Sequence, residues 1–136
     1  MKINPYLSFN GNCAEAFAFY EKALGGKMVY KSTYGETPMA KQMPQEMHGK
    51  IIHARLDVGG EILMGCDAGD RYSKPQGIQI TINVKTPAEA ESLFKGLSEG
   101  ATVTMPIQET FWATRFGMLI DQFGIPWMIN CEKIQS

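Results

Sequence analysis

The sequence has little net charge, few cysteines and no long apolar run. Its 13 basic and 14 acidic residues nearly cancel, and neither sign gathers in a block. Nucleic-acid binders normally carry a basic patch, so nucleic acid is not expected as a partner. A membrane helix needs about 20 apolar residues in a row, and no segment approaches that length. Because the start also lacks the apolar core of a signal peptide, we expect no membrane partner and a cytoplasmic location.

Cysteine occurs three times, as Cys13, Cys66 and Cys131, and never with C-x-x-C spacing. An odd count without that spacing argues against a disulfide framework and against a thiolate zinc site. Motifs for catalysis are equally scarce, because there is no Ser-His-Asp order, no paired carboxylate motif and no phosphate loop. The 136 residues are 44% hydrophobic without a break in composition, which predicts a single domain with an ordinary core.

Hydrophobic periodicity predicts a first module over residues 1–66. A helix near 13–24 has Asn12 as N-cap and Glu15 in the position that completes a capping box. A polar loop over 35–49 carries Met39, Met43 and Met47 at every fourth residue. This spacing favours either a short lid helix over a ligand or, more simply, a small apolar cluster that pins the loop to the body. The strands of this module are expected over residues 3–9, 28–34, 51–58 and 61–66.

The second half repeats the first. Thr86, Pro87 and Glu89 begin a helix near 87–98, as an N-cap, a first-turn proline and a capping-box residue. The first helix segment, 13–26, aligns with 87–100, and the hairpin segment 60–64 aligns with 124–128. Strands are expected over 78–84, 113–120 and 125–131, with a turn at 121–124. Residues 77–136 therefore form a second module.

Because the second half repeats the first, we expect the order βαβββ in each half. Two such copies predict an α+β fold in which two pseudo-symmetric, cup-shaped sheets carry their helices outside. The concave surface that the two copies enclose is the natural place for function.

Three segments resemble the PhnB-like branch of the vicinal oxygen chelate superfamily, to which glyoxalase I, bleomycin-resistance proteins and extradiol dioxygenases belong. They are NPYLSFNGNCAEAFAFY at residues 4–20, IIHARLDVGG at 51–60 and QETFWATRFGMLIDQFGIPWMIN at 108–130. The resemblance implies paired βαβββ modules and, together with the aromatic pair Phe111 and Trp112, a homodimer. Members of this branch have been likened to a ubiquinone-pathway methyltransferase, but no glycine-rich loop for a nucleoside cofactor is present here.

The resemblance also indicates where a divalent metal is held in metal-dependent relatives, on the first and fourth strands of each module. In this sequence those positions fall on Pro5, Met64, Gln79 and Met128. Proline has no donor, thioethers are soft and an amide oxygen is neutral, so we expect no metal and no other cofactor. A displaced site around His53 would need a second histidine or a carboxylate at ligand spacing, which the sequence does not offer.

Strand alternation extends this set of positions to a candidate ligand site. Arg115 is an expected anion-binding fork, and Trp112 an expected stacking surface, at the mouth of the cup. Purely structural roles are the alternative for these residues. Arg55 and Arg115 would then pair with Asp57, Glu61 or Asp121, and Trp112 would fill a dimer contact. Trp127 is expected in the core. The candidate ligand-binding residues are His53, Arg55, Met64, Gln79, Thr81, Trp112, Arg115 and Met128.

Three classes of function follow. The favoured class is metal-independent binding of a small polar or anionic molecule in the cup. The first alternative is an enzyme of the lyase, isomerase or dioxygenase type, with a displaced metal site or with His53 as general acid or base. The second alternative is a non-catalytic dimeric module with a structural or regulatory role.

Overall fold

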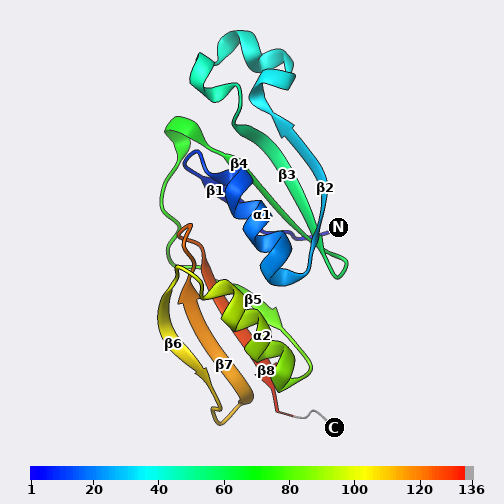
Figure 1. Cartoon of the computed structure of the whole chain (residues 1–136), viewed down its shortest axis with the longest axis vertical. Coiled ribbons are helices and arrows are strands. Elements are labelled where there is room, and N and C mark those ends of the chain that lie inside the picture. The colour runs from blue at the N-terminus through cyan, green and yellow to red at the C-terminus, as the bar shows by residue number, and fades with distance from the viewer. Residues whose placement is uncertain (134–136) are drawn as a thin grey trace. The chain divides into compact units, whose positions relative to one another are not determined.

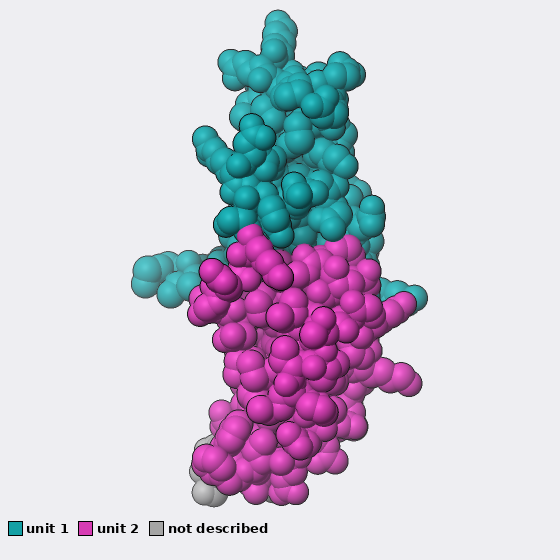
Figure 2. Space-filling model, turned by 90° about the vertical axis from the view of Figure 1, so that its left-hand side faces the viewer, with its two compact units in different colours: residues 1–73 teal, residues 74–136 magenta. Residues whose placement is uncertain are grey.

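A computed structural model describes residues 1–133 of the chain. The chain divides into two compact units, Met1–Ser73 and Lys74–Ser136 (Figure 2). Each unit has the order strand, helix and three strands, which confirms the two βαβββ modules and the α+β class (Figure 1). That the two units make one domain stays a prediction. No helix among the described residues is long and apolar enough to cross a membrane.

In the first unit, one helix packs on a four-stranded sheet. The sheet has the order β1-β4-β3-β2, with β1 parallel to β4 and the other neighbours antiparallel. The predicted helix is confirmed to the residue as α1 (Cys13–Leu24), whose buried face includes Phe17 and Tyr20. The strands are β1 (Tyr6–Phe9), β2 (Lys27–Thr33), β3 (Ile51–Val58) and β4 (Glu61–Asp67).

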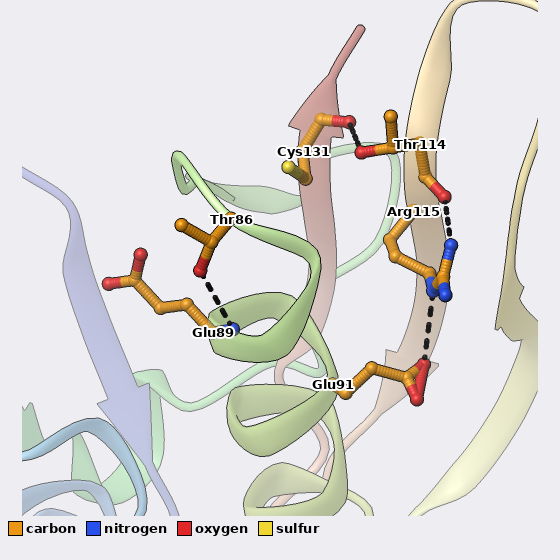
Figure 3. Close-up of polar contacts among 6 residues, drawn as sticks. All are labelled: Thr86, Glu89, Glu91, Thr114, Arg115 and Cys131. Carbon is orange, nitrogen blue, oxygen red and sulfur yellow. Dashed lines mark hydrogen bonds and ion pairs between the residues drawn. The ribbon is translucent and has the colours of Figure 1, made fainter.

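The second unit repeats this topology. Its sheet has the order β5-β8-β7-β6, again with a parallel pair, β5 and β8, at one edge. The helix is α2 (Pro87–Leu97), and Thr86 caps it by accepting a hydrogen bond from the backbone N–H of Glu89 at 3.1 Å (Figure 3). The strands are β5 (Ile80–Asn83), β6 (Thr102–Gln108), β7 (Ala113–Ile120) and β8 (Pro126–Glu132).

Each helix approaches its sheet closely at a glycine. A Cβ atom on Gly65 of β4 would lie 2.7 Å from the ring of Phe17, and one on Gly117 of β7 would lie 2.6 Å from the ring of Phe94. Real Cβ contacts are not that short, so the aromatic rings occupy space that any larger residue would fill. The two glycines therefore set how near the helices lie to the strands.

The start of α1 differs from the expectation. Asn12 makes no side-chain cap, so the predicted capping box is wrong. Instead the buried carboxylate of Asp67, at the end of β4, accepts hydrogen bonds from the backbone N–H groups of Gly11 at 2.9 Å and Cys13 at 3.0 Å. The acceptor at the start of the helix therefore comes from a strand far along the chain.

The loop between β2 and β3 consists of three short 3₁₀ turns, Tyr34–Glu36, Pro38–Gln42 and Gln45–Met47. The Nε2 atom of His48 lies 2.8 Å from the carbonyl oxygen of Ala40 and 3.2 Å from that of Met43, which ties the turns together. The methionine spacing therefore does not produce a lid α-helix. No methionine of this loop is fully buried, and Met39 is 42% exposed.

Candidate functional site

Each sheet has one face against the helix of its own unit and an opposite face, which we call the open face. On the first open face, Tyr6 pairs with Met64, Met64 with Arg55, and Arg55 with Tyr30 across the four strands. Residues in register lie on the same side of a sheet, and side chains two positions apart along a strand do so as well. We define the first open face by six residues: Tyr6, Tyr30, His53, Arg55, Met64 and Cys66.

The first open face carries a stacked aromatic cluster. The Tyr6 hydroxyl lies 3.3 Å from Nδ1 of His53, and the two rings stack with centroids 5.8 Å apart and an angle of 27°. Tyr30 approaches the other side of the cluster, with its ring centroid 5.8 Å from that of His53. A β-bulge between Met28 and Tyr30 shifts the register of β2 at this point. A depression of about 420 Å³ lies there, lined by Val29, Tyr30, His53 and Arg55.

The Tyr6 hydroxyl and the Cys66 thiol lie on this face and influence each other's pKa. Partial burial raises the pKa of Tyr6 well above its ordinary value, and the interaction with Cys66 raises it further. Burial likewise raises the pKa of Cys66, against a smaller opposing contribution from Tyr6. Both groups therefore keep their protons at neutral pH.

Arg55 stands beside this cluster without a partner. It is exposed, and no hydrogen bond or ion pair joins it to another described residue. The alternative in which Arg55 pairs with Asp57 or Glu61 is therefore wrong, and the Asp57 carboxylate accepts from the backbone N–H of Gly60 at 2.8 Å. The guanidinium thus offers all its N–H donors at the edge of the depression.

The second open face is formed by β5, β7 and β8 in the other unit. Thr81 and Met128 are in register, with the Thr81 hydroxyl 3.7 Å from the methionine sulfur. Asn83 and Asn130 are in register too, and Nδ2 of Asn130 donates to Oδ1 of Asn83 at 3.0 Å. The buried Oδ1 of Asn130 has no partner among the described residues. Exchanging O and N in both amides would leave the Nδ2 atom of Asn130 unpaired instead, so one polar atom is orphaned either way.

Three of the predicted site residues lie outside these two faces or at their margin. Gln79 is exposed and precedes β5, which begins two residues later than the predicted strand. Trp112 lies just before β7, 42% exposed and edge-on to Phe111 and Phe116. Trp127, by contrast, is 2% exposed and lies in the core as predicted.

Arg115 is the third of them and a correction. It faces α2, where its Nε atom lies 3.5 Å from the Glu91 carboxylate, and it does not contribute an anion-binding fork on the second open face (Figure 3). Arg115 pairs with Cys131 in the same register that pairs Gly117 with Ile129. It lies two positions from Gly117, whose added Cβ would meet Phe94 of α2, so strand alternation places Arg115 on the helix face of the sheet.

The strand register shows which side chains lie beside Met64 and Met128, two of the metal-ligand positions inferred from the resemblance. Tyr6 pairs with Met64 and Thr81 with Met128, so Tyr6 and Thr81, rather than Pro5 and Gln79, are the first-strand residues beside the two methionines. A protonated phenol, a hydroxyl and two thioethers supply no negative charge, and they do not fit a zinc, nickel or magnesium ion. Within residues 1–133, no group of three His, Cys, Asp or Glu side chains is placed to hold a metal.

Tyr6, Tyr30 and Asn130 are site residues that sequence reasoning missed. The residue type of Tyr6 and Tyr30 does not indicate a binding site, because exposed tyrosines are common in strands. The signal was available only through Met64 and Met128, since the cross-strand and same-strand neighbours of a correctly placed residue share its face. The parallel register that joins Tyr6 to Met64 links two distant parts of the first unit, and no local pattern encodes it.

The chain is similar in sequence and in structure to known proteins. A family model described as 3-demethylubiquinone-9 3-methyltransferase matches residues 1–130. The protein YjdN of Escherichia coli is 36% identical over 144 residues, covering 99% of this chain and 98% of YjdN. Protein PA1353 of Pseudomonas aeruginosa, a crystal structure, is 46% identical with a TM-score of 0.87, covering 98% of this chain and 99% of that one.

Two further structures extend the likeness. The PhnB protein of Bacillus cereus is 25% identical with a TM-score of 0.79, covering 96% of this chain and 99% of its own. The fosfomycin resistance protein FosX of Listeria monocytogenes shares 10% identity and has a TM-score of 0.70, covering 98% of this chain and 94% of its own. At that identity FosX supports the shared fold alone.

Proposed function

Because this chain belongs to the PhnB-like family of the glyoxalase and bleomycin-resistance superfamily, we propose that it binds a small organic molecule on its first open face without a metal. The observation that carries the proposal is the unpaired Arg55 beside the stacked pair of Tyr6 and His53. Arg55 and His53 line a depression of about 420 Å³, within the range of small-molecule sites. Met64 supplies a soft, adaptable wall on the same face.

The second open face completes the proposal. Thr81 and Met128 occupy positions equivalent to Tyr6 and Met64, and they offer a hydroxyl and a thioether. Gln79 and Trp112 lie at the ends of this region and remain candidates for ligand contact. We propose that both open faces serve ligand binding, and that the first open face carries the side chains that recognise the ligand.

The methyltransferase description of the family is not part of the proposal. A nucleoside cofactor is usually held by a glycine-rich turn between a strand and a helix. Here the turn before α1 is Asn10-Gly11-Asn12, and the turn before α2 is Val84-Lys85-Thr86. The first turn holds a single glycine and the second holds none, so neither is the glycine-rich turn that lets a pyrophosphate or a nucleoside approach the backbone.

The test is ligand-observed NMR with a panel of single-ring neutral, cationic and anionic compounds, run with EDTA and again with added zinc. We expect at least one compound to bind with equal affinity in both conditions and to shift the resonances of His53 and Met64. Metal analysis of the tag-free protein should show no stoichiometric divalent ion. Binding that requires zinc, or one bound ion lost on His53→Ala with the fold intact, would overturn the proposal.

A metal-free enzyme is a second candidate, favoured by the contact between Tyr6 and His53. A hydroxyl on Nδ1 fixes the orientation of the imidazole, which is what a general acid or base requires. Solvent-proton exchange into a bound carbonyl compound, followed by NMR, would detect such activity. Loss of the exchange in His53→Gln, with binding retained, would support it, whereas exchange equal in both proteins would exclude His53 from the chemistry.

We further propose that the protein is a cytoplasmic homodimer. The support for dimerisation is Phe111, 87% exposed, packed edge-on to Trp112 just before β7. Such a large exposed aromatic pair is typical of protein interfaces. The support for a reducing compartment is that all three cysteines are free, with Cys13 and Cys131 buried.

A further inference from the structure

The donors and acceptors of the first open face are unequally distributed. Arg55 presents a guanidinium, which only donates hydrogen bonds and which matches a carboxylate in a two-pronged geometry. No described carboxylate is bound to it, and the nearest acid along its strand, Asp57, is engaged with the turn at Gly60. The face therefore holds a positive charge without a counter-charge.

His53 adds a second donor. Tyr6 keeps its proton because burial raises its pKa, and its hydroxyl lies 3.3 Å from Nδ1 of His53. An imidazole whose Nδ1 accepts from this hydroxyl carries its proton on Nε2, where the proton is available to a ligand.

The walls of the depression suit a flat molecule. Tyr30 and His53 line it with two rings whose planes differ by 47°, and Val29 adds an aliphatic surface. Aromatic faces bind other rings by offset or edge contacts, and the arginine plane can also stack. A volume of about 420 Å³ holds a compound of one or two rings.

We infer that the ligand of the first open face is a planar aromatic acid, whose carboxylate pairs with Arg55 and His53 while its ring lies against Tyr30. This inference rests on the proposed function, because it names the class of molecule that the same site takes. A neutral or cationic ring of the same size would leave the guanidinium without a counter-ion.

The experiment compares benzoate, benzamide, benzylamine and cyclohexanecarboxylate by NMR titration of the full chain. Benzoate should bind at least about tenfold more tightly than benzamide, since a charge-assisted pair with arginine is lost in the amide. Cyclohexanecarboxylate keeps the charge without the flat ring, so it should fall between the two. Benzylamine should not bind.

Variants locate the effect. Arg55→Gln should weaken benzoate binding about tenfold or more and remove the preference over benzamide. Arg115→Gln is the matched control, because that arginine faces α2 and pairs with Glu91, and it should leave benzoate binding unchanged. Arg55→Lys keeps the charge but not the fork, and it should restore only part of the affinity. Arg55 is exposed, so these variants should fold, which thermal unfolding checks.

The outcomes separate the two claims. Equal binding of benzoate and benzamide at His53 and Met64 would overturn the aromatic-acid inference and leave the proposed function standing. The same loss of benzoate binding in Arg55→Gln and Arg115→Gln would also overturn it, because a general charge effect would then suffice. Absence of binding by all four probes would overturn the inference, and the wider compound panel would then decide the proposed function.

Discussion

The carboxylate of Asp67 accepts a hydrogen bond from the backbone N–H of Ile51 at 2.8 Å, joining the end of β4 to the start of β3. Its other oxygen accepts from Gly11 and Cys13 at the start of α1. One buried side chain thus satisfies three backbone donors from two elements. The negative charge also lies at the positive end of the α1 dipole.

Replacing Asp67 with asparagine should destabilise the protein. The amide keeps one accepting oxygen, but its NH₂ group then meets an N–H donor that has lost its acceptor. Breaking a buried, charge-assisted hydrogen bond of this kind costs about 2–3 kcal/mol in the free energy of unfolding. Urea unfolding would measure it, with Asp57→Asn, on the exposed turn at Gly60, as a control that should change by less than about 1 kcal/mol. Equal losses in both variants would contradict the role assigned to Asp67.

Gly65→Ala tests the close approach of α1 to its sheet. The added methyl group would lie 2.7 Å from the Phe17 ring and 2.8 Å from the backbone oxygen of Leu7, so relief requires movement of the backbone. Overpacking of this kind costs about 1–3 kcal/mol. Gly49→Ala is the matched control, because no atom lies within 4 Å of its added Cβ, and it should be neutral or slightly stabilising. A neutral Gly65→Ala in thermal unfolding would show that the helix adjusts freely.

Asn130→Leu tests whether the orphaned amide atom serves the fold. Leucine removes a buried polar atom that has no partner and leaves only the exposed Asn83 amide without its bond. We therefore expect the free energy of unfolding to be unchanged or to rise by about 1 kcal/mol. A loss beyond about 1 kcal/mol in urea unfolding would mean that Asn130 stabilises the unit through a contact that the hydrogen bonds do not show.

Stability should fall in alkali. Burial raises the pKa of Cys13 above its ordinary 9.0 and that of Tyr6 above its ordinary 10.0. The unfolded chain loses these protons first, so the folded state binds more protons and its stability declines as the pH rises above about 9. Urea midpoints between about pH 8 and about pH 10.5 should show the decline, and Cys13→Ala should make it shallower. A slope unchanged in Cys13→Ala would contradict the assignment.

Phe111→Ser tests the proposed dimer. Removing an aromatic side chain that is 87% exposed should leave the fold intact and weaken self-association about tenfold or more. Sedimentation velocity over a concentration series measures this, with thermal unfolding as the check on folding. A wild-type protein that sediments as a monomer at micromolar concentration would rule out the dimer.

The sequence by itself determined the architecture. The internal repeat, which aligns 13–26 with 87–100 and 60–64 with 124–128, predicted two βαβββ modules. Capping and apolar spacing predicted α1 to the residue and α2 to within one. Capping and apolar spacing are local features, and the repeat lies within the chain, so all three can be read from the sequence without knowledge of the fold. Alternation in β3 likewise put His53 and Arg55 on one face.

Only the tertiary structure decided which side chains meet. The parallel register of β1 on β4 puts Tyr6, and not Pro5, beside Met64. Packing rather than local pattern sets the pairing between strands that are distant in sequence. The pairing of β7 with β8 placed Arg115 on the face that packs against α2, where it meets Glu91. The cap of α1 came from Asp67 for the same reason: a buried helix end takes whichever acceptor the fold brings to it.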